Sequence, residues 1–185
     1  MILYIHGFRT TKTSYTSRLL KKHYQNNIIL AQHPIKPKDA IKYLENIIQT
    51  KNITSIMASS LGGFYAIYLA TKYNLKTVLI NPSINPYKTT KTYIGKNITE
   101  DGLVFSWKNK HLKQLAQYKV KPKKLNQKIF YIMLQKGDQV LDYKIAKKRF
   151  SHAKQKIENG GSHRFDNLKR HFKSISSFIK EDTKN

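Results

Sequence analysis

The stretch that most constrains the fold is residues 54–66, which combines an apolar segment, a tight turn and a helical pattern. Residues 54–57 are β-prone and apolar, which predicts a buried strand. From Phe64 onward, aromatic and leucine residues recur at helical spacing. Between them lies A-S-S-L-G-G, a variant of the G-x-S-x-G nucleophile elbow with Ala58 in place of the first glycine. Small flanking residues allow the sharp turn, so Ser60 is expected to stand exposed at the strand end, although a serine that merely caps a helix is the alternative.

The remainder of the chain alternates predicted strands with predicted helices. Strands are expected at 2–5, 27–31, 54–57, 77–80, 129–134 and 154–157, and helices at 14–24, 37–50, from 64 onward, 111–118 and 165–179. Strands separated by helices imply right-handed crossovers and a parallel sheet covered on both faces. We therefore expect one α/β domain over residues 1–185, with a mostly parallel sheet of about six strands.

Residues capable of chemistry follow the carboxyl ends of these strands. The segment 6–8 (H-G-F) follows the first strand, Ser60 the third, Asp138 the fifth and His163 the sixth. Sites in parallel sheets lie beyond the carboxyl ends of the strands, so a serine, an acid and a histidine are expected to meet there. Their order along the chain, Ser…Asp…His, is the order of α/β-hydrolases, whereas other triad folds use other orders.

Several neighbouring residues compete for these roles. Asp142 is the alternative acid, and Asp138 is preferred because it directly follows the strand-and-glycine signal. Ser59 and Ser162 are expected to be hydrogen-bonding neighbours of the site. His6 is expected to fix the turn after the first strand by hydrogen bonds, the alternative being contact with the active site.

Five segments stand in order along the chain: Y-I-H-G-F at 4–8, S-S-L-G-G-F-Y-A at 59–66, N-P-S-I-N-P at 81–86, G-D-Q-V-L-D-Y at 137–143 and G-G-S-H-R-F at 160–165. With these segments the sequence resembles a compact α/β-hydrolase of the YqiA-like esterase family. The resemblance spans almost the entire chain and implies Ser60 as nucleophile, Asp138 as orienting acid and His163 as base. Ala58 and the strong basicity of the chain depart from the family pattern.

The expected activity is that of a serine hydrolase acting on carboxylic esters or thioesters of short to medium acyl chains, through an acyl-enzyme. Backbone amides of Phe8 and Leu61 are expected to form the oxyanion hole. Arg9 either holds an anionic group of the substrate or is an exposed loop arginine. The expected partner is a small-molecule ester or an acyl-CoA-like substrate, and no metal or organic cofactor is required. A zinc site at His163 and His171 would lack further obvious ligands.

The net charge of +25 would attract nucleic acid, anionic membranes or anionic small molecules. Arginine supplies only five of the 35 basic residues, and no nucleic-acid-binding motif accompanies the lysines, so nucleic acid is not the expected partner. The alternative function is therefore a non-catalytic hydrolase-fold protein that binds nucleic acid or acidic membrane through lysines.

No apolar run reaches the ~18 residues of a transmembrane helix, no signal peptide is visible, and there is no cysteine. A cytoplasmic enzyme fits these features, and they do not predict its oligomeric state.

Residues 85–126 are the least regular part of the pattern. They form a connection of about 40 residues, which is longer than a plain crossover. Its aromatic and aliphatic residues are interrupted by Gly95 and Gly102. The segment is expected either to lie over the site as a small cap that shapes the acyl pocket or to be an ordinary loop packed on the sheet.

Overall fold

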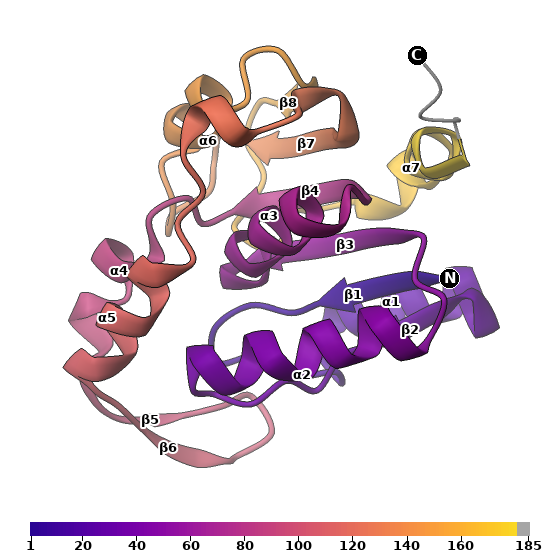
Figure 1. The fold of residues 1–185 in the computed structure, drawn as a ribbon. Coiled ribbons are helices and arrows are strands. Elements are labelled where there is room, and N and C mark those ends of the chain that lie inside the picture. Colours follow the sequence, from indigo (N-terminus) through magenta and orange to yellow (C-terminus); the bar gives the residue numbers. More distant parts are fainter. Residues whose placement is uncertain (181–185) are drawn as a thin grey trace.

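The computed structural model describes residues 1–180, and its centre is a six-stranded sheet with the order β2-β1-β3-β4-β7-β8 (Figure 1). All neighbouring strands in this sheet are parallel. The strands are β1 (Ile2–Ile5), β2 (Ile28–Leu30), β3 (Ser55–Ser60), β4 (Lys76–Pro82), β7 (Phe130–Gln135) and β8 (Lys154–Glu158). The central strands β4 and β7 are buried along their whole length, as expected for parallel strands covered on both faces. The predicted parallel α/β sheet is therefore confirmed.

Helices cover both faces of the sheet, in agreement with the prediction (Figure 1). Helices α1 (Tyr15–Tyr24) and α7 (Phe172–Lys180) bury apolar residues such as Leu20 and Ile175 against one face. Helices α2 (Pro37–Thr50), α3 (Leu61–Tyr73) and α6 (Tyr143–Arg149) bury residues such as Leu44 and Phe64 against the other face. No helix within residues 1–180 is both long enough and apolar enough to cross a membrane.

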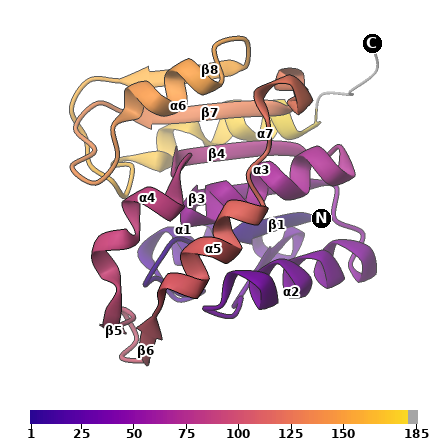
Figure 2. The same cartoon turned by 60° about the vertical axis from the view of Figure 1, so that its left-hand side comes forward.

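The segment 85–126 is largely structured and lies beyond the carboxyl ends of the central strands (Figures 1 and 2). It contains α4 (Pro86–Thr89), a 3-10 turn (Lys91–Tyr93), the antiparallel hairpin of β5 (Gly95–Ile98) and β6 (Val104–Trp107), α5 (Asn109–Gln117) and a second 3-10 turn (Pro122–Lys124). Trp107 at the end of the hairpin is fully buried and packs against Phe8, with their ring centroids 4.9 Å apart. The segment is thus packed against the loop that follows β1. Its role as a cap stays a prediction.

The closing helix begins later than the sequence pattern predicts, at Phe172 instead of Phe165. Phe165 and Asn167 have positive φ angles of 64° and 56°, which are incompatible with an α-helix. The amide of Asp166 donates to Gln135 Oε1 at 2.8 Å, so this stretch is tied to the end of β7. Phe165 and Leu168 are nevertheless buried in the same apolar cluster as α7, which explains why the apolar spacing suggested one continuous helix.

Candidate active site

Ser60 occupies a sharp turn between β3 and α3, with φ 51° and ψ −125°. Two close approaches make this turn possible. A Cβ added to Gly62 would lie 2.5 Å from the carbonyl oxygen of His6, and one added to Gly63 would lie 2.6 Å from Pro82 Cβ. Only glycine allows the start of α3 to approach these neighbours so closely. The structure therefore has the backbone of a nucleophile elbow at the predicted serine.

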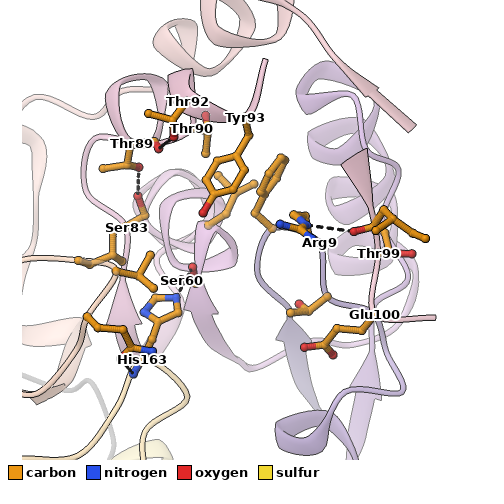
Figure 3. Close-up of a pocket in the computed structure, with 17 residues that line it drawn as sticks. Arg9, Ser60, Ser83, Thr89, Thr90, Thr92, Tyr93, Thr99, Glu100 and His163 are labelled. Atoms are coloured by element: carbon orange, nitrogen blue, oxygen red, sulfur yellow. Dashed lines mark hydrogen bonds between the residues drawn. The ribbon is translucent and has the colours of Figure 1, made fainter. Parts of the chain in front are cut away.

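The three residues predicted to form the triad lie in one hydrogen-bonded chain (Figure 3 shows Ser60 and His163). His163 Nε2 is 2.9 Å from Ser60 Oγ, and His163 Nδ1 is 2.8 Å from Asp138 Oδ2. The second carboxylate oxygen of Asp138 accepts the amides of Val140 and Leu141, each at 2.8 Å. The carboxylate is thus fixed by backbone donors on one side and faces the imidazole on the other. In a neutral His163 with its proton on Nδ1, Nε2 is free to accept the serine proton.

Asp142 and Ser59 have other partners. The carboxylate of Asp142 accepts the amide of Lys144 at 2.9 Å and so caps the start of α6. It is Asp138, not Asp142, that contacts the imidazole. Ser59 Oγ is 2.9 Å from the hydroxyl of Tyr4, so Ser59 is a hydrogen-bonding neighbour of the site, as expected.

His171, the second histidine of the zinc site considered from the sequence, is not part of the hydrogen-bonded chain of Ser60, His163 and Asp138. His171 Nε2 is 2.8 Å from Glu158 Oε1. Within residues 1–180, no three His, Cys, Asp or Glu residues are grouped closely enough to hold a metal ion.

The loop that carries His163 is held by two buried polar side chains that the sequence did not single out. Asn81, at the end of β4, donates to the carbonyl oxygens of Ser162 and His163 at 3.0 and 3.2 Å. Gln135, at the end of β7, accepts the amides of Ser162 and Asp166 at 3.0 and 2.8 Å. Asn81 Oδ1 in turn accepts the amide of Gln135 at 3.0 Å. Asn81 begins the segment N-P-S-I-N-P that carries the resemblance, but apart from that the sequence signal for this support is only a polar residue at the end of each of two buried strands.

His6 is the first residue of the loop after β1, and its side chain contacts the backbone of the next residue. Its Nδ1 is 3.0 Å from the carbonyl oxygen of Gly7, and its ring stacks on His33 with centroids 4.2 Å apart. Burial, reinforced by the neighbouring His33, lowers the pKa of His6 to about 3, so the ring is neutral. These contacts agree with the expectation that His6 fixes the turn after β1 by hydrogen bonds. Gly7 in the same loop packs closely against the elbow, since a Cβ added to Gly7 would lie 2.9 Å from Ser60 Cβ.

Over residues 1–180 the sequence matches the model of a family described as an uncharacterised protein family, UPF0227. The chain belongs to this family. The resemblance to YqiA-like proteins is thereby confirmed.

Several solved structures have the same architecture, some of them described as α/β-hydrolases, and the sequence identities are low enough that the likeness concerns the fold. The ydeN gene product of B. subtilis superposes with a TM-score of 0.70 at 17% identity, covering 97% of this chain and 98% of that one. An alpha/beta superfamily hydrolase from Oenococcus oeni gives 0.69 at 18% identity, covering 97% and 92%. Est1E from Butyrivibrio proteoclasticus, in complex with ferulic acid, gives 0.68 at 12% identity, covering 96% and 87%. This UPF0227 protein therefore has the α/β-hydrolase fold.

Two cavities of the UPF0227 protein meet at Ser60. The larger, cavity A, has a volume of about 530 Å³ (Figure 3). It is lined by Phe8, Arg9, Thr10, Ser60, Leu61, Ser83, Thr89, Thr90, Thr92, Tyr93, Ile98, Thr99, Glu100, Gln139, Val140, Leu141 and His163. Residues 89–100 of the segment 85–126 thus form one wall. Phe8 and Leu61, whose amides are the predicted oxyanion donors, both lie beside Ser60 in this cavity.

Arg9 lines cavity A but directs its side chain at the β5–β6 hairpin. Its Nε donates to the carbonyl oxygen of Ile98 at 3.0 Å, and its guanidinium lies 5.9 Å from the centre of the Tyr93 ring (Figure 3). The side chain is therefore engaged with the cavity wall. A contact between Arg9 and an anionic substrate group stays a prediction.

Proposed function

We propose that this UPF0227 protein is a serine hydrolase that cleaves carboxylic esters or thioesters of short to medium acyl groups. One observation carries the proposal: Ser60, His163 and Asp138 are joined by hydrogen bonds of 2.9 and 2.8 Å at the point where two cavities meet. A serine on a strained elbow, a histidine within hydrogen-bond reach and a carboxylate that orients the ring are the groups that acyl transfer requires.

The reaction follows from this arrangement. Ser60 Oγ attacks the acyl carbon while His163 Nε2 takes its proton, and Asp138 stabilises the resulting imidazolium. The amides of Phe8 and Leu61 would donate to the oxyanion, an interaction in which one donor is typically worth about 2.7–4 kcal/mol of transition-state stabilisation. The bond from the acyl carbon to the leaving oxygen or sulfur then breaks, and the leaving atom receives the proton from His163. Water, deprotonated by the same imidazole, releases the acid and restores Ser60.

The size of cavity A supports a small acyl group. Its volume of about 530 Å³ lies in the ordinary range of small-molecule sites. Residues from 89–100 supply one wall of the cavity, and the contacts of Tyr93 and Ile98 with Arg9 hold that wall in place. One structural relative, Est1E, has ferulic acid bound, which is a carboxylic acid like the product expected here.

Hydrolysis of p-nitrophenyl esters of two to ten acyl carbons tests the proposal. We expect measurable turnover that favours the shorter chains, and Ser60→Ala should reduce kcat by several orders of magnitude while thermal unfolding stays nearly unchanged. A fluorophosphonate probe should label Ser60, as mapped by peptide mass spectrometry. The Ser59→Ala variant is the matched control, because it removes the adjacent hydroxyl and should still be labelled. A folded protein that neither hydrolyses any ester nor takes up the probe would favour the non-catalytic alternative.

A further inference from the structure

A second cavity, cavity B, opens on the same catalytic residues as cavity A. Its volume is about 420 Å³, and both cavities include Ser60 and His163 in their walls. Phe8, Thr10 and Glu100 are also shared, so these residues stand between the two spaces. An ester has two sides at its reacting carbon, one acyl and one alcohol. A substrate held at Ser60 can therefore extend into both cavities.

The two linings differ in chemistry. Apolar and aromatic side chains in cavity A are Phe8, Leu61, Tyr93, Ile98, Val140 and Leu141. Both cavities have many hydroxyl-bearing side chains, but cavity A also has four aliphatic ones, Leu61, Ile98, Val140 and Leu141, whereas the lining of cavity B has no leucine, isoleucine or valine. Outside the residues that the two cavities share, the hydroxyl-bearing side chains of cavity B are Tyr4, Thr13, Ser14, Tyr15, Thr16 and Ser59. Hydrocarbon is stabilised by the first kind of wall, and a solute with many donors and acceptors by the second. This contrast assigns the acyl chain to cavity A and the alcohol to cavity B.

The most buried polar side chain of cavity B is that of Tyr4. This side chain rises from β1, is only 1% exposed, and has its hydroxyl 2.9 Å from Ser59 Oγ, one residue before Ser60. Burial is the main cause that raises its pKa to about 12, so it remains a neutral hydroxyl that both donates and accepts. A polar group this well buried beside the nucleophile gives the cavity a fixed point of recognition.

Charges at the edge of cavity B are mixed. Arg164 Nη2 lies 3.7 Å from Glu100 Oε1, and both side chains are substantially exposed. Arg18 donates to the carbonyl oxygen of Thr13. Guanidinium groups supply donors and Glu100 supplies acceptors, a combination that suits hydroxyl groups. An anionic ligand would be attracted by the arginines but would meet the carboxylate of Glu100 in the same space.

We propose that cavity B binds the leaving group and that this group is a neutral alcohol with several hydroxyls, such as glycerol or a monosaccharide. The inference rests on the proposed hydrolase function and adds the class of alcohol to it. In the acylation step the bond between the acyl carbon and the alcohol oxygen breaks. His163 Nε2 returns the proton taken from Ser60 to that oxygen, and the intact polyol leaves through cavity B.

Three butyrate esters that differ only in the alcohol test this assignment. They are 1-butyrylglycerol, n-propyl butyrate and 1-butyrylglycerol 3-phosphate, each measured as kcat/KM with p-nitrophenyl butyrate as the activity reference. We expect kcat/KM for the glycerol ester to exceed that for the propyl ester about tenfold or more, since the two additional hydroxyl groups can form hydrogen bonds with the wall of cavity B. The phosphate ester should be no better than the glycerol ester.

The variant Tyr4→Phe removes one hydroxyl from cavity B and leaves the ring. It should lower the ratio of kcat/KM between the glycerol and propyl esters about threefold to tenfold. Tyr24→Phe is the matched control, because Tyr24 also bonds a serine, Ser176 at 3.2 Å, but lies outside both cavities. This control should keep the wild-type ratio. A ratio is compared because general damage to the fold lowers both values together.

The possible failures are distinguishable. Equal kcat/KM for the glycerol and propyl esters, with p-nitrophenyl butyrate hydrolysed, overturns the role of cavity B and leaves the hydrolase proposal standing. A strong preference for the phosphate ester that Arg18→Gln abolishes also overturns it, in favour of an anionic leaving group. Absence of hydrolysis of all four esters by folded protein overturns both proposals.

Discussion

The carbonyl oxygen of Arg9 accepts a hydrogen bond from the amide of Glu100, 2.9 Å away. Arg9 directly follows Phe8 in the loop after β1, and Glu100 lies in the turn of the β5–β6 hairpin. The same arginine donates through Nε to Ile98, and the Phe8 ring packs against Trp107 at the hairpin end. The loop expected to supply an oxyanion donor is thus shaped by the hairpin as well as by the sheet. Segment 85–126 therefore supports the predicted oxyanion loop in addition to walling cavity A.

Arg9→Asn tests this coupling. Asparagine tolerates the left-handed backbone of Arg9, whose φ is 61°, but it lacks the guanidinium that contacts Ile98 and Tyr93. We expect kcat to fall about tenfold, with little change in KM. Loss of an entire oxyanion-hole donor typically lowers kcat by about 10²–10³, and here the donor would only be displaced. In Arg9→Val kcat should fall further, because valine also disfavours the left-handed backbone. A raised KM with kcat unchanged in Arg9→Asn would instead indicate that the guanidinium binds substrate.

Asp138→Asn should abolish most of the activity, whereas Asp142→Asn should not. The amide in Asp138→Asn cannot stabilise an imidazolium at His163, and the equivalent change in a serine protease triad costs about 10⁴ in kcat. Asp142 caps α6, and asparagine is an equally good N-cap, so its variant should retain both stability and turnover. Steady-state kinetics with p-nitrophenyl butyrate compares the two. Loss of activity in Asp142→Asn alone would reverse the assignment of the acid.

The sequence sufficed to predict the elbow and the meeting of Ser60, Asp138 and His163 because these features depend on local rules. A sharp strand-to-helix turn needs small residues next to the serine, and parallel strands bring their carboxyl ends to one edge. The support from Asn81 and Gln135 escaped notice, since a polar residue at a strand end is uninformative until its partner is known. Both side chains contact Ser162, which lies 81 residues after Asn81 and 27 residues after Gln135.

The start of the last helix and the division of the site into two cavities were also beyond sequence reasoning. Phe165 is buried with α7 although its backbone is left-handed, so its apolar spacing reports burial and does not report helical structure. Cavity B joins Tyr4 from β1 and Tyr15 from the first turn of α1 to Arg164 beside the histidine. No pattern of spacing specifies that three separate segments enclose one space, because only tertiary packing decides it.

The two small positions of the elbow should differ in their tolerance of substitution. A Cβ on Gly62 would lie 2.5 Å from the carbonyl oxygen of His6 and closer still to that of Ile5, and backbone atoms cannot move away cheaply. Gly62→Ala should therefore lower the free energy of unfolding by about 1–3 kcal/mol and disturb the elbow. Ala58→Gly, which restores the usual motif, should cost about 0.5–1 kcal/mol. Urea unfolding of both variants measures the difference, and equal costs would contradict the steric explanation.

Glu158 at the end of β8 joins the last strand to the closing helix. Its carboxylate accepts hydrogen bonds from Gln135 Nε2 at 2.9 Å, from Arg170 Nη2, and lies 2.8 Å from His171 Nε2. Burial alone would raise the pKa of Glu158, but these hydrogen bonds together outweigh it and lower the pKa from 4.5 to about 2. Because Gln135 also holds the His163 loop, the ionised carboxylate stabilises that support indirectly.

This lowered pKa predicts a specific pattern of acid sensitivity. A carboxylate whose pKa is lower in the folded than in the unfolded state contributes stability that is fully present above about pH 4.5 and is lost as the pH falls towards 2. Glu158→Gln should lower the free energy of unfolding at pH 7 by about 1.5–3 kcal/mol and should flatten its decline between pH 4.5 and 2. Glu45→Gln is the matched control, because Glu45 forms an ion pair with the exposed Lys72, and such surface pairs contribute little to stability. Urea unfolding across this pH range measures both, and parallel curves for wild type and Glu158→Gln would show that Glu158 contributes no linkage between proton binding and folding.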